Sequence, residues 1–434
     1  MGEPVVDADR SALRGRQIDR LRRLLTEALP GNRFYARKLA AAGVCPDDLR
    51  SAADVPCLPF TTKAELAADQ AEHPPYGTAL THPPEQYCRL HQTSGTSTGR
   101  PLRWLDCPVS WEWLLNCWRV SFPVMGLTPH DRAYFPFSFG PFLGFWSAFE
   151  AASRHGCLCL PGGGMTSTAR LRFLIEHRAT VVFATPTYAL HLAELAAAEG
   201  IDLAGSDVRA VVVAGEPGGN IPATRERIEE VWGARVFDHY GMTEVGPVAI
   251  ECEADPGSML VLESEYLAEV LTPNGDHPAS DGEVGELVVT NLGRVGSPLI
   301  RYRTGDLVRA EPDPPPLPGV PRWLRLRGGV LGRVDDMIHV RGNNLYPTAI
   351  EAVVRRFPEV IEFRIVIDQT GPLPDLRVEV EPSDPASGAR LAEAVARAVR
   401  DDLLFRVEVC PVPPGTLPRF EMKARRVVQI QSAT

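Results

Sequence analysis

Short apolar runs alternate with helical patterns between residues 169 and 237, and this alternation leaves few architectures open to the chain. Strands are predicted over residues 180–184, 209–214 and 234–237, and helices over residues 169–178, 188–199 and 221–232. Strands that alternate with helices indicate an α/β fold around a mostly parallel sheet. Short strands with turns between residues 258 and 291 then indicate a β-rich subdomain.

A proline-rich stretch divides the chain into two unequal parts. Six of the eleven residues from 311 to 321 are prolines, which lack a backbone donor and fix φ, so the stretch predicts a stiff loop. Beyond it, helices are predicted over residues 347–356 and 389–404, and strands over residues 361–367, 376–380 and 407–409. We therefore expect a large N-terminal α/β domain over residues 1–332 and a small C-terminal α+β domain over residues 333–434.

The composition excludes several classes of protein. Acidic residues exceed basic ones, 45 − 55 = −10, which is the opposite of what a non-specific nucleic-acid binder requires. We find no run of about 18 apolar residues, so we expect no membrane span. The nine cysteines are scattered and the first residues lack the layout of a secretory signal. These features favour a reduced, cytoplasmic protein.

The densest polar run is Thr93–Gly99, in which hydroxyl residues surround two glycines. Glycines let the backbone bend so that several N–H groups converge on one anion, and Ser and Thr add donors. Because Arg100 and Pro101 follow, the run is not a Walker A loop, and it is not a dinucleotide fingerprint either. Taken alone, it predicts a phosphate-binding loop or, more commonly, a solvated turn.

Further polar clusters follow along the chain. Asp238–Glu244 comes at the end of a predicted strand, where α/β folds bind ligands. There Glu244 offers an oxygen ligand for Mg²⁺, although a turn with a surface glutamate is the simpler interpretation of this cluster alone. Arg301–Asp306 places a carboxylate after a glycine, where it can accept hydroxyl hydrogen bonds, as from a ribose. The last clusters are residues 332–347 and the basic run 422–427, which alone indicates a basic tail.

Together, in this order and with these gaps, the clusters resemble the adenylate-forming superfamily of acyl-CoA synthetases and luciferases. The similarity is greatest to the phenylacetate-CoA ligase-like family. The short length of the chain, the Gly-Glu-Pro step at residues 215–217 and the Arg-Gly-x-Asn-x-x-Pro pattern at residues 341–347 favour that branch. The resemblance extends over nearly the whole chain. It implies an ATP-dependent acid–thiol ligase, with Mg²⁺ as cofactor, coenzyme A as co-substrate and a homodimeric assembly.

The resemblance also implies roles for matching residues. Lys423, on a mobile C-terminal domain, would bridge the carboxylate and the α-phosphate, Thr243 would contact phosphate and Glu244 would hold Mg²⁺. Asp306 would bind the ribose, with Arg333 nearby, and Asp335 would be the hinge. The residues implied to bind nucleotide or to shape its site are Thr93, Ser94, Gly95, Thr96, Ser97, Thr98, Gly99, Gly215, Glu216, Pro217, Asp238, His239, Tyr240, Gly241, Asp306, Arg333, Asp335 and Gly342.

The sequence departs from the family pattern in three places. Arg100 stands where the phosphate loop usually has lysine, and Met422 stands where a glycine usually precedes the final lysine. Many relatives carry a zinc site that uses cysteines after the ribose aspartate, and here that stretch has no cysteine. Structural zinc needs about four ligands, so we expect none.

A run of aromatic residues between positions 134 and 142 suggests the acid-binding pocket. Flat rings stack well on aromatic walls, although ordinary core rings would give the same pattern. The residues expected to line the pocket are Tyr134, Phe135, Phe139, Gly140, Ala214, Tyr240 and Gly241. We therefore expect an aryl acid of the phenylacetate, benzoate or anthranilate type. Two alternatives stay open: transfer to a carrier-protein thiol or an amine, and a non-catalytic sensor of nucleotide or acyl ligand.

Overall fold

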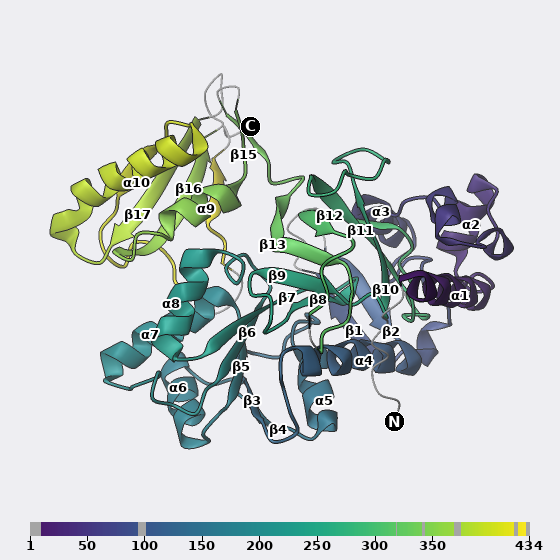
Figure 1. Ribbon diagram of the computed structural model, residues 1–434, viewed down its shortest axis with the longest axis horizontal. Coiled ribbons are helices and arrows are strands. Elements are labelled where there is room, and N and C mark those ends of the chain that lie inside the picture. The colour runs from purple at the N-terminus through teal and green to yellow at the C-terminus, as the bar shows by residue number, and fades with distance from the viewer. Residues whose placement is uncertain are drawn as a thin grey trace.

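A single large sheet forms the centre of the protein, as the computed structural model shows (Figure 1). The structure describes residues 10–93, 101–317, 319–340, 343–368, 375–420 and 424–430. The eleven strands of the sheet are, in spatial order, β10 (Tyr266–Leu271), β11 (Val284–Asn291), β12 (Tyr302–Glu311), β13 (Arg325–Arg333), β9 (Ser258–Val261), β8 (Gly246–Glu251), β7 (Arg235–Met242), β6 (Ala210–Ala214), β5 (Val181–Ala184), β3 (Arg132–Phe135) and β4 (Leu158–Pro161).

The sheet changes character at β7. The four neighbouring pairs from β4 to β7 are parallel, and the six from β7 to β10 are antiparallel. The predicted α/β fold is thus confirmed, and the strands predicted between residues 180 and 237 are parallel. The sheet as a whole is not mostly parallel, because the β-rich strands belong to it as well. The β-rich region does not form a sheet of its own. Its strands continue the large sheet on the side of β7 that faces away from β6.

Helices cover both faces of the parallel half. On one face lie α6 (Ser167–Glu176), α7 (Pro186–Glu199) and α8 (Pro222–Trp232), and on the other α4 (Pro108–Val124) and α5 (Trp146–His155). Local sequence fixes the start of α7, since Pro186 occupies its first position and the Thr185 hydroxyl accepts the N–H of Tyr188 at 3.1 Å. The helices predicted in this region are confirmed to within about two residues.

Smaller elements pack around the antiparallel half. Helices α1 (Arg10–Ala28), α2 (Arg33–Ala42) and α3 (Lys63–Glu72) lie beside β10 and β11 in Figure 1. The strands β1 (Arg89–Gln92) and β2 (Arg103–Asp106) form an antiparallel pair. The short 3₁₀ helices of the chain are η1 (Pro46–Asp48), η2 (Ala52–Cys57), η3 (Pro84–Gln86) and η4 (Pro385–Ser387). Among the described residues, no helix combines the length and apolar character that crossing a membrane requires.

A separate α+β domain follows the large sheet, with a hydrophobic core of its own. Its four-stranded sheet has the order β18 (Glu408–Pro411), β17 (Asp375–Pro382), β16 (Val360–Asp368) and β19 (Val427–Ile430). Its other elements are α9 (Pro347–Val354), α10 (Gly388–Leu403) and the pair β14 (Ile338–Val340) and β15 (Asn343–Leu345). The domain lies against the end of the large domain that carries α7 and α8 (Figure 1).

Candidate active site

The buried carboxylate of Asp306 is contacted by side chains from two other strands. Asp306 of β12 accepts a hydrogen bond of 2.6 Å from the Tyr240 hydroxyl of β7 and one of 2.7 Å from Arg333 of β13. Burial, and then the Asp306 charge, raise the pKa of Tyr240 well above its usual range, so its hydroxyl stays a donor. A carboxylate offers about four lone pairs, so Asp306 can accept hydroxyl hydrogen bonds from a ligand as well.

The Glu244 carboxylate is held by the same strand. The Tyr302 hydroxyl, four residues before Asp306 on β12, donates to Glu244 Oε1 at 3.0 Å. Burial, followed by the Glu244 charge, raises the pKa of Tyr302 well above its usual range. Glu244 is only 3% exposed, so the interpretation of a surface glutamate is wrong. The ribose aspartate and the magnesium glutamate that the sequence suggested therefore lie on one side of the molecule.

A buried ion pair supports the turn that carries Thr243 and Glu244. Arg294 donates to the carbonyl oxygens of both residues, at 3.0 and 2.8 Å. The same guanidinium binds Asp106 through two hydrogen bonds of 2.7 Å, and both side chains of this ion pair are fully buried. Planar guanidinium matches carboxylate in such two-point contacts. Sequence reasoning missed this pair, whose members lie 188 residues apart.

Lys63 is a second residue that sequence reasoning missed. Its Nζ lies 3.6 Å from Glu244 Oε1. The side chains of Thr62 and Glu65 cap α3 reciprocally, which makes Lys63 the first residue of that helix. Thr61 pairs with β12 through two backbone hydrogen bonds of 2.9 Å, to Arg301 and from Arg303. The Thr-x-x-Glu capping pattern at residues 62–65 was the available signal, but it indicates only a helix start.

The three residues before Gly241 take different positions along β7. Tyr240 reaches Asp306, as described above. Asp238 lies under Gly219, where a Cβ would come within 2.5 Å of its carboxyl carbon, and burial raises the pKa of Asp238 well above its usual range. His239 instead stacks on Trp118 of α4 at 4.3 Å, and burial lowers the pKa of His239 to about 3. The strand continues to Met242, so this segment is not the loop that was expected.

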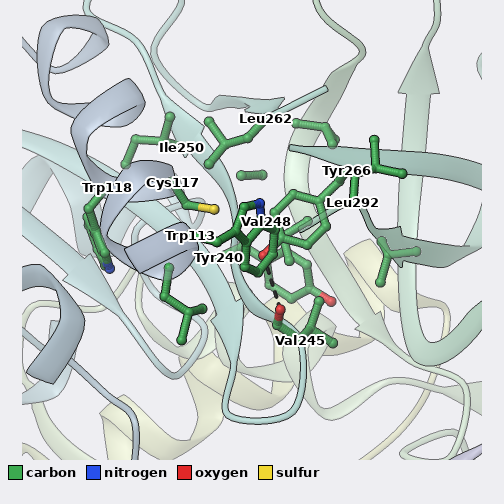
Figure 2. Close-up of a cluster of buried hydrophobic side chains, with 14 of the residues drawn as sticks. Trp113, Cys117, Trp118, Tyr240, Val245, Val248, Ile250, Leu262, Tyr266 and Leu292 are labelled. Atoms are coloured by element: carbon green, nitrogen blue, oxygen red, sulfur yellow. Dashed lines mark hydrogen bonds between the residues drawn. The ribbon is translucent and has the colours of Figure 1, made fainter. Parts of the chain in front are cut away.

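Figure 2 shows the buried side chains that support this part of β7. Trp113 of α4 lies beside Tyr240, whereas Trp118 lies farther along the same helix, and the Tyr266 hydroxyl donates to the Val245 carbonyl oxygen at 3.1 Å. This hydrogen bond helps to hold the turn between β7 and β8.

Rings gather where the acid pocket was expected, with one exception. Phe135 stacks on Phe183 with ring centroids 4.5 Å apart, and Phe139 lies 4.5 Å from Trp146. The Gly140 carbonyl accepts the Trp146 indole N–H at 3.0 Å, and Ala214 and Tyr240 belong to the same hydrophobic cluster. A Cβ atom added to Gly241 would lie 3.2 Å from Cε1 of the His239 ring. Tyr134 is the exception, because it lies in the cluster on the opposite face and donates to the Arg170 carbonyl at 2.9 Å.

The Gly-Glu-Pro step follows β6, as expected. Gly215 adopts a φ of 93°, which side chains disfavour, and both Gly215 and Pro217 are exposed. Glu216 is half-buried, and its two carboxylate oxygens accept backbone N–H groups of Thr187, at 2.9 Å, and of Ala424, at 2.5 Å. Ala424 belongs to the C-terminal domain, so Glu216 joins the two domains.

Several predicted site residues lie outside the described part of the chain. They are Ser94, Gly95, Thr96, Ser97, Thr98, Gly99, Gly342 and Lys423. Thr93 is described: it is buried, its N–H donates to the Leu102 carbonyl at 2.9 Å and its hydroxyl accepts the Leu102 N–H at 3.0 Å. Asp335 is exposed, in the turn after β13. Among the residues that the structure describes, no three His, Cys, Asp or Glu side chains are grouped to hold a metal ion.

Comparison with known proteins agrees with this geometry. Residues 40–293 match the AMP-binding enzyme family, and residues 342–430 match the AMP-binding enzyme C-terminal domain. The chain therefore belongs to the AMP-binding family of adenylate-forming enzymes.

Within that family the similarity is to phenylacetate-coenzyme A ligases. The ligase of Escherichia coli (strain K12) is 31% identical over 99% of this chain and 98% of that protein, and the ligase of Thermus thermophilus is 31% identical over 97% of each. The protein is an AMP-forming acid–thiol ligase that acts through an acyl-adenylate, which confirms the predicted family and enzyme class.

One solved relative was captured in several states. A 2-hydroxyisobutyryl-CoA ligase in the postadenylation state, with 2-HIB-AMP, gives a TM-score of 0.90 at 29% identity over 99% of this chain and 91% of that one. In the thioesterification state, with 2-HIB-AMP and CoA, the same ligase gives a TM-score of 0.73 over 100% of this chain and 94% of that one. The arrangement of this chain is thus closer to the postadenylation structure.

Proposed function

We propose that the protein activates an aryl carboxylic acid of the phenylacetate, benzoate or anthranilate type with ATP, and transfers the acyl group to the thiol of coenzyme A. The observation that carries this proposal is the juxtaposition of two carboxylates at β12, beside a cluster that contains many aromatic residues. Asp306 belongs to β12, and Glu244, in the turn after β7, accepts a hydrogen bond from Tyr302 of the same strand. The names of the phenylacetate-coenzyme A ligases support the aryl acid and the thiol acceptor.

The reaction proceeds in two displacements. An oxygen of the acid attacks the α-phosphorus of ATP, the bond to the bridging oxygen breaks, and pyrophosphate leaves. The sulfur of coenzyme A then attacks the acyl carbonyl, losing its proton, and AMP leaves with the former acid oxygen. In both steps the protein aligns the reactants and stabilises the charge that develops.

The described residues divide this work between two carboxylates. We assign the ribose hydroxyls to Asp306, whose position Tyr240 and Arg333 fix from two sides. We assign a magnesium ion to Glu244, because Mg²⁺ in such sites takes one or two carboxylates together with phosphate oxygens. When bound, the ion would neutralise phosphate charge. Lys63, at the same carboxylate, supplies a second positive charge toward the phosphates, and Thr243 supplies a hydroxyl.

The remaining roles are proposed from the family resemblance. The phosphate loop over residues 93–99 would bind pyrophosphate, residues 215–217 would border the adenine, and Lys423 would bridge the acid and the α-phosphate. We also propose the domain division at residues 332 and 333, with Asp335 as the hinge. The separate core that begins with Ile338 supports this division. Assembly as a homodimer in the cytoplasm is part of the same proposal.

The acid pocket is proposed to lie among the rings of Phe135, Phe139 and Phe183. Phe135 and Phe183 stack on each other, and Phe139 packs against Phe137 and Phe149. A region so rich in rings supports an aromatic ligand, because rings prefer offset or edge-on contacts with other rings. Tyr134 takes no part in it, since it lies on the other face of the sheet. A small hydroxy acid is the second candidate, favoured by the fold similarity to the 2-hydroxyisobutyryl-CoA ligase.

One assay separates these possibilities. ATP–pyrophosphate exchange is measured over a panel of aryl acids and short hydroxy acids, and the products formed with coenzyme A are identified by mass. We expect the fastest exchange with an aryl acid, followed by its thioester. Exchange with hydroxy acids alone would overturn the aryl assignment. Exchange without a thioester would indicate a carrier-protein or amine acceptor, and the loss of both signals would indicate a sensor.

A further inference from the structure

The chain that follows Lys423 contacts the large domain at the start of α7. The Ala424 N–H donates to Glu216 Oε2 at 2.5 Å, and two residues later Arg426 donates to the Thr187 hydroxyl at 3.1 Å. Glu216 and Thr187 are themselves joined, because the Thr187 N–H donates to Glu216 Oε1 at 2.9 Å. Four residues from two domains therefore form one continuous hydrogen-bonded group.

Arg426 is rigid within its own domain. Its guanidinium binds both oxygens of Glu362 on β16, at 2.7 and 3.0 Å, and lies 3.5 Å from Glu351 of α9. It also lies over the ring of Phe363, 5.2 Å from the centroid. Because Arg426 is 8% exposed and held on several sides, its contact with Thr187 joins the start of α7 to a rigid part of the small domain.

The contact of Glu216 with Ala424 is suited to repeated breaking. A half-buried carboxylate and a backbone N–H can both be hydrated once they separate, so opening leaves no buried group without a partner. The structure that contains this contact resembles the postadenylation state of the solved relative more closely than its thioesterification state, with TM-scores of 0.90 and 0.73.

We propose that Glu216, Thr187, Ala424 and Arg426 form an interdomain latch that positions the Lys423 segment for adenylation and is released for thioester formation. This inference rests on the proposed function, and it deepens the role of Glu216. A residue that only borders adenine would not need both carboxylate oxygens engaged by backbone N–H groups. Glu216 is accordingly a positioning residue, acting through the residue that immediately follows Lys423.

The test compares the two half-reactions in the full-length protein. Glu216→Ala, Glu216→Gln and Thr187→Val are measured in single-turnover formation of the acyl-adenylate, using the panel acid that the wild type activates best. They are then measured in thioester formation from the preformed acyl-adenylate and coenzyme A. Glu226→Gln on α8, an exposed glutamate outside the latch, is the matched control.

We expect Glu216→Ala to slow adenylation by about 10- to 100-fold, the range of one charge-assisted hydrogen bond, and to slow transfer from the preformed adenylate much less. Glu216→Gln keeps one acceptor oxygen and should recover part of the loss, and Thr187→Val should lose less than Glu216→Ala. Equal losses in both half-reactions would overturn the latch in favour of an adenine contact. Unchanged adenylation would overturn it as well.

A second measurement stays informative if the wild type activates no acid, which would refute the proposed function. Hydrogen exchange of the backbone N–H groups of residues 424–430 is compared without substrates. Glu216→Ala should speed exchange at Ala424 by about tenfold if docking depends on this carboxylate. Unchanged exchange would refute the latch, whatever the activity.

Discussion

The nucleotide site proposed at the large sheet and the contact between the domains hold charged groups in opposite ways. At this site, Arg294 and Asp106 are fully buried and joined at two points, and Asp306 is fixed by side chains from two other strands, β7 and β13. Between the domains, the half-buried Glu216 holds a backbone N–H. The first arrangement is preorganised and costly to disrupt. The second can open and close, which an enzyme that presents one site to two successive reactions requires.

Truncation of Arg294 should have the largest effect on the folded protein. Arg294→Ala leaves the Asp106 carboxylate buried without its cation, and this should cost about 3–5 kcal/mol of the free energy of unfolding. Urea denaturation followed by fluorescence measures the loss. The site should suffer too, because Arg294 holds the turn that carries Glu244.

Arg227→Ala is the matched control from the domain contact. Arg227 of α8 donates to the Pro358 carbonyl across the interface at 3.1 Å, in an exposed position. Its truncation should cost about 0.5–1 kcal/mol. If the two arginine variants proved equally destabilised, the contrast between the rigid site and the separable contact would fail.

The next largest effect is expected in catalysis. Glu244→Gln keeps an acceptor for the Tyr302 hydroxyl but removes the negative charge proposed to bind Mg²⁺. ATP–pyrophosphate exchange should fall by about 10²–10³-fold, as for other groups that stabilise charge, while thermal unfolding changes little. Tyr302→Phe removes only the hydrogen bond and should lose about tenfold or less. A loss in Tyr302→Phe as large as in Glu244→Gln would show that positioning, rather than charge, is what Glu244 contributes.

The same contrast decides what the sequence could predict. The strands β5 and β6 were predictable because a buried parallel strand is apolar throughout, as in Val211–Val213. The local pattern at Glu244 favoured a surface glutamate, and the roles proposed for Glu244 and Asp306 came from the family resemblance of several motifs taken together. Arg294 with Asp106, and Lys63 with Glu244, join positions far apart in the chain. Such pairs have no local signature, since strand register and helix docking alone bring them together.

Local patterns also failed where an element continued beyond its apparent end. The strand predicted over residues 234–237 was too short, because β7 runs to Met242 and is followed, after a short turn, by the antiparallel β8. Tyr134 and Phe135 looked like one aromatic wall, yet adjacent strand residues point to opposite faces. No helix was predicted where α4 lies, although Glu112, Asn116 and Arg119 recur along it at helical spacing and most of its other residues are buried.

His239 gives a smaller, pH-dependent test of how rigid the sheet region is. Burial lowers the pKa of His239 to about 3, whereas an unfolded histidine has a pKa of about 6.5. Between these values the unfolded chain binds the proton and the folded chain does not, so stability falls as the pH falls. From pH 7 to pH 5 this group alone should remove about 2 kcal/mol.

The His239→Phe variant should keep the stacking on Trp118 and lose that pH dependence. Urea unfolding of wild type and variant at pH 7 and pH 5 measures the difference, in which the other titrating groups cancel. If the free energy of unfolding changed equally between pH 7 and pH 5 in the two proteins, the His239 ring would be hydrated in solution. This part of the sheet would then be more accessible to water than the structure indicates.

Lys63 lies between the two kinds of region, and its effect should be the smallest. It reaches Glu244 from α3, and its side chain is 26% exposed. Lys63→Met should therefore raise the ATP concentration for half-maximal exchange by only about two- to fivefold at saturating Mg²⁺, the size of a partly screened ion pair. Lys38→Met is the control, because Lys38 pairs with Glu65 at the surface of the same helix. If Lys63 merely competed with the metal for Glu244, the variant would need less Mg²⁺ and its ATP dependence would not change. If the ATP requirement rises and stays raised at high Mg²⁺, the Lys63 ammonium group contacts the phosphates. The preorganised site then includes α3 as well as the sheet.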